Sequence, residues 1–170
     1  MKTRTVIGVL LMLLTASILA QESNKPEKKL EFLVGQWECT ALNHRTGEKR
    51  TGTSKIEWIL NDTWLQWKFT IQTDNGPIGV LTLINYHEKK KQYAFYSFNP
   101  FDQEPLPHFG HWTDDNALRL KITENEGETW IDFLIKEDGN FDQMHYQVRA
   151  DGEKILYSTT HYTKYDRKGE

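Results

Sequence analysis

Six histidines and one cysteine are the side chains of this sequence best suited to acid–base, nucleophilic or metal chemistry. His108 and His111 are three residues apart, and residues at that spacing on a strand point to opposite faces. They cannot hold one metal ion together unless the chain bends at Gly110, so we predict no metal site. His145 and His161 lie on two later segments, and either side chain can face the interior of a β domain.

A nucleophilic enzyme needs a serine or cysteine that is activated by a positioned base. The sequence contains no Gly-x-Ser-x-Gly motif, and Ser97 in Tyr96-Ser97-Phe98 reads as an ordinary strand position. Cys39 reads as a small buried apolar residue, and as the only cysteine it excludes an intramolecular disulfide. We predict no catalytic residue from these patterns.

Aromatic residues are the more informative group, because six tryptophans is a high number for 170 residues. Aromatic side chains bring a large apolar area on few rotatable bonds, which suits both a core and a ligand site. The candidates for lining a ligand cavity are Trp58, Trp67, Tyr96, Phe98 and Trp112. Arg149 is the candidate partner for a ligand carboxylate. The sequence does not decide which face of each strand points inward.

Alternation of apolar and polar residues, interrupted by turn signals, runs through most of the chain. Asp74-Asn75-Gly76 and Asp138-Gly139-Asn140 are examples of these turns. The pattern predicts about ten short strands, at 34–42, 52–60, 64–73, 78–86, 93–98, 109–113, 118–122, 131–135, 144–148 and 155–165.

No crossover helix separates these strands, so a parallel sheet is excluded. Consecutive antiparallel strands that each have one apolar face avoid open sheet edges by closing into a barrel. We therefore predict an all-β protein, an antiparallel up-and-down barrel of about ten strands, with a β-sandwich as the alternative.

The N-terminus has the three parts of a secretory signal peptide. Lys2 and Arg4 precede an apolar run from Val6 to Leu14, and Ala20 supplies a small residue before polar Gln21. The run is shorter than the ~20 apolar residues of a membrane span. We expect a signal peptide at 1–20, a polar tether at 21–29 and one β-barrel domain at 30–168, with a helical turn near 30–33. The predicted location is the periplasm or outside the cell, without membrane insertion after cleavage.

Charge narrows the range of partners. The formal charge is −3, and removal of Lys2 and Arg4 changes it to −5. A mildly acidic chain is poorly suited to nucleic acid or anionic lipid, so neither is expected as a partner. The oligomeric state is not predicted.

The segment Phe32-Leu33-Val34-Gly35-Gln36-Trp37 resembles the Gly-x-Trp opening of calycin barrels, which include lipocalins, fatty-acid-binding proteins and nitrobindins. The chain from about 30 to 167 is similar to the bacterial domain-of-unknown-function family 1579. That similarity rests on 32–37, 56–60, 63–67, 76–86, Lys91 and Tyr93. It implies a calycin-like barrel and no activity. Gly35 would let the chain bend and Trp37 would plug one end, whereas a nitrobindin-like heme would use His161.

Barrels of this strand number can hold one small molecule. The leading hypothesis is an exported protein that binds a small, largely apolar molecule in its interior and needs no cofactor. The alternatives are an enzyme that acts on a hydrophobic small molecule in the same barrel, and a partner-binding domain with a filled core.

Overall fold

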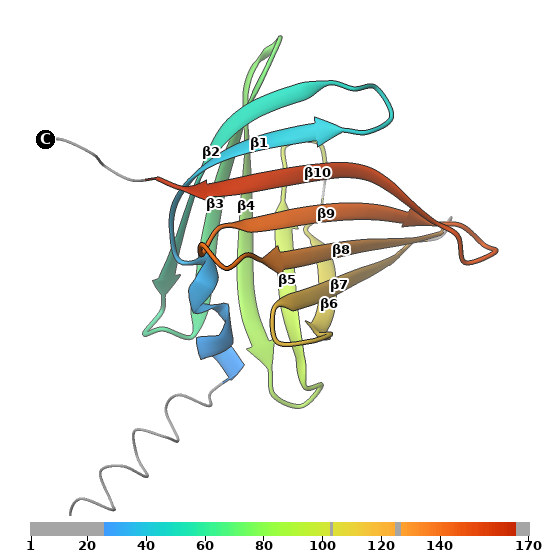
Figure 1. The fold of residues 1–170 in the computed structure, drawn as a ribbon. Coiled ribbons are helices and arrows are strands. Elements are labelled where there is room, and N and C mark those ends of the chain that lie inside the picture. The colour runs from blue at the N-terminus through green and yellow to red at the C-terminus, as the bar shows by residue number, and fades with distance from the viewer. Residues whose placement is uncertain (1–25, 103, 125–126, 166–170) are drawn as a thin grey trace, which may run out of the picture. The chain divides into compact units, whose positions relative to one another are not determined.

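Within the residues that the computed structural model describes, 26–102, 104–124 and 127–165, the chain forms ten antiparallel strands after one short helix (Figure 1). The chain divides into two compact units, Met1–Glu31 and Phe32–Glu170, and the strands belong to the second. The elements are η1 (Pro26–Leu33), β1 (Gly35–Asn43), β2 (Lys49–Ile59), β3 (Trp64–Thr73), β4 (Gly76–His87), β5 (Gln92–Phe98), β6 (Leu106–Trp112), β7 (Ala117–Glu124), β8 (Gly127–Ile135), β9 (Phe141–Val148) and β10 (Lys154–Lys164).

Each strand pairs with the next in the sequence, and β10 pairs with β1 to close the barrel. Trp37 lies opposite Lys164 and Cys39 opposite Tyr162 across this closing pair. The predicted up-and-down barrel of ten strands is confirmed, and the sandwich alternative is wrong because β1 and β10 leave no open edge.

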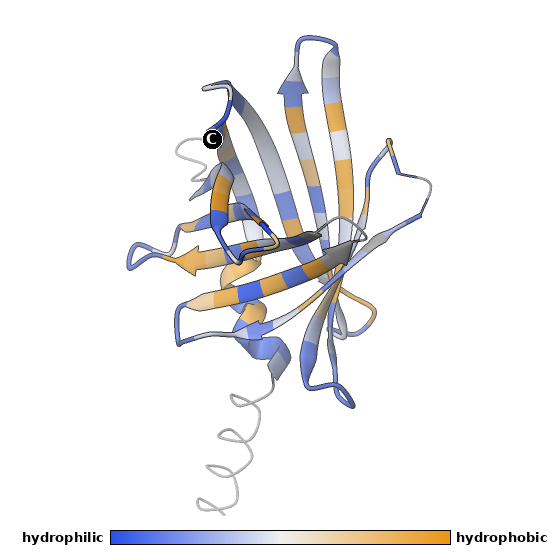
Figure 2. Cartoon of the chain, turned by 90° about the vertical axis from the view of Figure 1, so that its right-hand side faces the viewer, coloured by the Kyte–Doolittle hydropathy of each residue, from blue (hydrophilic) through white to orange (hydrophobic). Residues whose placement is uncertain are grey.

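Alternation along the strands separates the inside of the barrel from the outside, and Figure 2 shows hydrophobic and hydrophilic residues alternating along several of them. Leu65 and Trp67 of β3 are buried, as are Leu118 and Leu120 of β7. The intervening Gln66 and Arg119 are more accessible to solvent. The interior positions are therefore set by the period-two pattern of the sequence.

One end of the barrel is filled by aromatic side chains. Trp37 is 1% exposed and packs edge-on against Phe141 at 4.9 Å between ring centroids. Its indole Nε1 donates a hydrogen bond to the Leu33 carbonyl at 2.8 Å. Gly35 precedes it with φ of 146°, a backbone conformation that other residues rarely adopt. The expected structural roles of Gly35 and Trp37 agree with this packing.

The helical segment expected at 30–33 is a 3-10 helix that already begins at Pro26, inside the expected tether. The expected signal peptide at 1–20 and the first part of the tether lie outside the described residues. None of the helices in the described part of the chain is long and apolar enough to cross a membrane.

Candidate functional site

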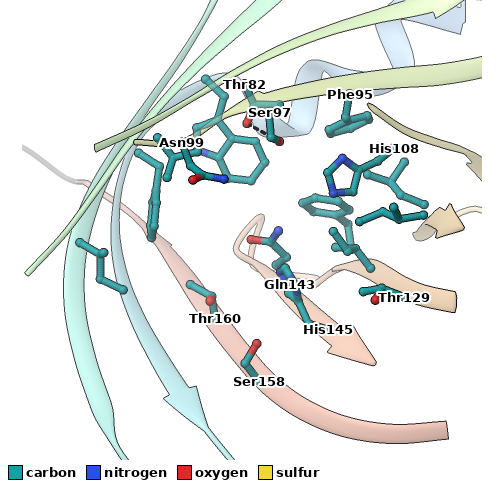
Figure 3. Close-up of a pocket in the computed structure, with 18 of the residues that line it drawn as sticks. Thr82, Phe95, Ser97, Asn99, His108, Thr129, Gln143, His145, Ser158 and Thr160 are labelled. Atoms are coloured by element: carbon teal, nitrogen blue, oxygen red, sulfur yellow. Dashed lines mark hydrogen bonds between the residues drawn. The ribbon is translucent and has the colours of Figure 1, made fainter. Parts of the chain in front are cut away.

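A cavity of about 630 Å³ lies inside the barrel (Figure 3). Aromatic and aliphatic side chains form part of its wall, among them Trp67, Phe69, Phe95 and Phe133. Phe95 and Phe133 stack with ring centroids 5.7 Å apart, and Trp67 lies 5.9 Å from Phe133. The volume falls in the range of pockets that hold one drug-sized molecule.

The rest of the cavity wall is formed by polar side chains. Hydroxyl, amide and imidazole groups come from Thr82, Ser97, His108, Gln143 and His145, among others. None of the cavity-lining residues that the structure describes is Asp, Glu, Lys or Arg. Because burying an unpaired charge is costly, this wall suits a ligand that is itself uncharged.

His145 and Tyr157 form the main hydrogen-bonded pair of the cavity wall. The Nδ1 atom of His145 lies 3.1 Å from the Tyr157 hydroxyl, and the two rings meet nearly edge to face. A bulge in β10 between Leu156 and Ser158 explains why Tyr157 reaches this place. A bulge places an extra residue opposite one partner residue and re-aims a side chain, so adjacent Tyr157 and Ser158 both line the cavity.

His145 is electrically neutral at physiological pH. Burial lowers its pKa from 6.5 to about 4, because the charged imidazolium loses its hydration, and His108 contributes repulsion in the same direction. His108 is itself 7% exposed and lines the cavity. Figure 3 shows both imidazoles projecting into the cavity from different strands.

Two further hydrogen-bonded pairs lie on the wall. The Thr82 and Ser97 hydroxyls are 3.1 Å apart, and the Tyr162 hydroxyl donates to Oε1 of Gln143 at 2.9 Å. Burial, and to a smaller extent the nearby Cys39 thiol, raises the pKa of Tyr162 well above its usual range, so its phenol stays protonated. Ser97 therefore has a hydroxyl partner, and no described carboxylate lines the cavity beside it.

No cluster of three or more histidine, cysteine, aspartate or glutamate side chains suited to a metal ion occurs among the described residues. Cys39 is buried, and burial, reinforced by the Glu38 carboxylate, raises its thiol pKa to about 11. The thiolate is the nucleophilic form of cysteine, so Cys39 is unreactive at neutral pH.

Comparison with known proteins supports the resemblance seen in the sequence. Residues 22–98 match the family model of the protein of unknown function DUF1579. That match extends through the end of β5, and the description of the family assigns no activity. A search of the curated proteins gives no match.

Fifteen chains of solved structures match this chain. One is an S-type phycobiliprotein lyase from Guillardia theta, 11% identical, with a TM-score of 0.61 over 84% of this chain and 93% of that chain. Likeness at this identity shows the fold alone. The likeness therefore agrees with the barrel fold that the sequence resemblance implied.

The aromatic residues predicted from the sequence lie at several different places in the barrel. Trp67 lines the cavity. Trp112 donates from Nε1 to the Tyr93 hydroxyl at 3.0 Å and contacts Phe32 near the filled end. Tyr96 and Phe98 lie on the outer face of β5, because they alternate with the cavity-lining Phe95 and Ser97.

The other three candidates also lie away from the cavity wall. Trp58 is opposite Leu65 in the β2–β3 pair and is not among the residues that line the cavity. Arg149 is exposed and forms an ion pair with Glu153. His161, the residue expected to bind heme, is half exposed on β10, with Nδ1 2.7 Å from Oδ1 of Asp142.

Sequence reasoning weighed His108 and His145 without selecting them. The alternation rule was correct for His108, which is buried in the barrel while His111 is exposed. His108 lies opposite the cavity-lining Phe95 in the β5–β6 pair. The register of these two strands, which the sequence does not give, was therefore needed to place His108 on the cavity wall. The apolar–polar alternation could not predict that Tyr157 lines the cavity, because the bulge in β10 interrupts the two-residue period of the strand.

Proposed function

We propose that this protein binds one uncharged small molecule of mixed polar and apolar character inside its barrel. The observation that carries this proposal is the cavity of about 630 Å³, with aromatic rings on its wall and no Asp, Glu, Lys or Arg among its described lining residues. The proposal revises the expected largely apolar ligand, because hydroxyl, amide and imidazole groups share the wall with the apolar side chains. It includes the export predicted from residues 1–20.

The cavity also bears on the alternative functions. A partner-binding domain with a filled core would leave no such space in the barrel. An enzyme that uses a buried histidine–carboxylate pair would need an acidic group beside a cavity histidine, and His145 instead pairs with the Tyr157 hydroxyl. One histidine–carboxylate contact, between His161 and Asp142, involves a half-exposed histidine side chain outside the described cavity lining. These observations favour binding over catalysis.

Titration of the domain with N-phenyl-1-naphthylamine, an uncharged fluorescent aromatic amine, tests the proposal. We expect saturable binding to one site, accompanied by a change in tryptophan emission because Trp67 lies on the cavity wall. Contacts between the probe and the apolar wall replace contacts that water supplies poorly. Absence of saturable binding to the folded protein would contradict the proposal.

Two substitutions on β10 locate the site. Thr160 is 8% exposed and lines the cavity, whereas Thr163 on the same strand is exposed. Thr160→Phe fills part of the cavity and is expected to weaken probe binding at least about tenfold, while Thr163→Phe leaves it unchanged. Circular dichroism of both variants checks that the barrel still forms. Equal affinities in the two variants would place the probe outside the cavity.

A further inference from the structure

Three of the polar side chains on the cavity wall carry rings whose nitrogen or hydroxyl groups form hydrogen bonds. His145 on β9, Tyr157 on β10 and His108 on β6 bring two imidazoles and a phenol to one cavity. Figure 3 shows the two histidines among the residues that line the cavity, together with Gln143 and Thr129. None of the described residues that line this cavity is Asp, Glu, Lys or Arg.

The imidazole of His145 has one ring nitrogen engaged and one open. Nδ1 is paired with the Tyr157 hydroxyl, and Nε2 has no hydrogen-bond partner among the described residues. If Tyr157 donates to Nδ1, then Nε2 carries the hydrogen and donates to a ligand oxygen. If Nδ1 donates to Tyr157, then Nε2 accepts from a ligand hydroxyl. The pair can therefore adapt to a hydroxyl or a carbonyl group.

We propose that His145, held by Tyr157, is a hydrogen-bonding subsite for an uncharged hydroxyl or carbonyl group carried on an aromatic ring. The neighbouring aromatic side chains, Phe95, Phe133 and Trp67, supply a surface against which such a ring packs. The inference rests on the proposed binding function and names the class of ligand. A carboxylate is disfavoured, because no lysine or arginine is among the described lining residues to balance its charge.

Three compounds with one ring system test the inference: naphthalene, 2-naphthol and 2-naphthoate. Their affinities are measured by displacement of N-phenyl-1-naphthylamine at neutral pH. We expect 2-naphthol to bind about three- to tenfold more tightly than naphthalene, the range of one net hydrogen bond. We expect 2-naphthoate to bind at least about tenfold more weakly than 2-naphthol.

Substitutions test whether His145 and Tyr157 cause the preference for 2-naphthol over naphthalene. His145→Phe should reduce the ratio of 2-naphthol to naphthalene affinity to about one without weakening naphthalene. Tyr157→Phe removes only the hydroxyl that fixes His145, and should reduce the ratio by a smaller factor. His111→Phe, on the exposed side of β6, is the matched control and should leave the ratio unchanged.

The outcomes separate this inference from the proposed function. If none of the three compounds displaces the probe and the probe itself does not bind, the binding function fails. If naphthalene and 2-naphthol bind equally well, only the subsite fails. A full preference for 2-naphthol in the folded His145→Phe protein, or tighter binding of 2-naphthoate, would also overturn the subsite.

Discussion

His145 shows how a single residue acquires its properties from the fold. In the sequence it was one of two histidines able to face inward, and nothing nearby indicated an unusual pKa. The barrel surrounds it with apolar walls, another histidine and a tyrosine, and the pKa falls to about 4. Its neutrality is therefore a consequence of tertiary structure and was outside the reach of sequence reasoning.

A dependence of stability on pH follows for the wild-type protein. The unfolded state binds a proton at His145 below about pH 6.5, whereas the folded state does so only below about pH 4. Unfolding therefore takes up a proton between these values, so stability falls as the pH falls from 6.5 to 4. The contribution is up to about 3 kcal/mol, since one pKa unit corresponds to about 1.4 kcal/mol.

Urea unfolding of the wild type and of His145→Gln between pH 4 and 7 measures this contribution. The free energy of unfolding should fall less steeply in His145→Gln than in the wild type. The groups that face His145 are His108 on β6 and Tyr157 on β10, and both remain in the variant. His161→Gln, outside the cavity, is the control. Identical pH profiles for the wild type and His145→Gln would show that His145 is solvated in the folded protein.

At the scale of the elements, the period-two pattern was sufficient to predict all ten strands in their order. It could not predict irregularities that depend on a neighbouring strand. Gly110 on β6 is one of these, because the backbone of β7 comes very close to it. A Cβ atom at Gly110 would lie 1.8 Å from the Arg119 carbonyl oxygen and 2.7 Å from the Leu120 Cα. Only glycine fits this position without a backbone shift.

Gly110→Ala should therefore destabilise the barrel by at least about 1–3 kcal/mol, the cost of overpacking a well-packed interior. Gly79→Ala on β4 is the matched control, because a Cβ atom there would meet no atom within 4 Å. Thermal unfolding of both variants measures the difference. A melting temperature of Gly110→Ala equal to that of Gly79→Ala would show that β6 and β7 are further apart than in this structure.

At the scale of the whole molecule, closure into a barrel was predicted only from the general principle that a sheet must protect its edges. The decisive contact joins β1 and β10, which are separated by most of the chain. The sequence was equally compatible with a cavity and with a filled core. Alternation identifies one face of each strand, but it does not show how much space the side chains leave inside the barrel. Trp67 lies on that inner face, whereas Tyr96 and Phe98 follow the alternation of β5 to the outside.

The last prediction concerns the chain as it is made in the cell. A positively charged start, an apolar run and small Ala20 are the features that signal peptidases require, so we predict that the mature chain begins near Gln21. N-terminal sequencing of protein recovered from the periplasm or medium of an expressing bacterium measures this. A chain produced directly from Gln21 contains every residue of the cavity wall. It should therefore bind N-phenyl-1-naphthylamine with the same affinity as the unprocessed chain that still carries residues 1–20. A recovered chain that retains Met1 would contradict export, whereas a large difference in affinity would show that residues 1–20 contribute to the binding site.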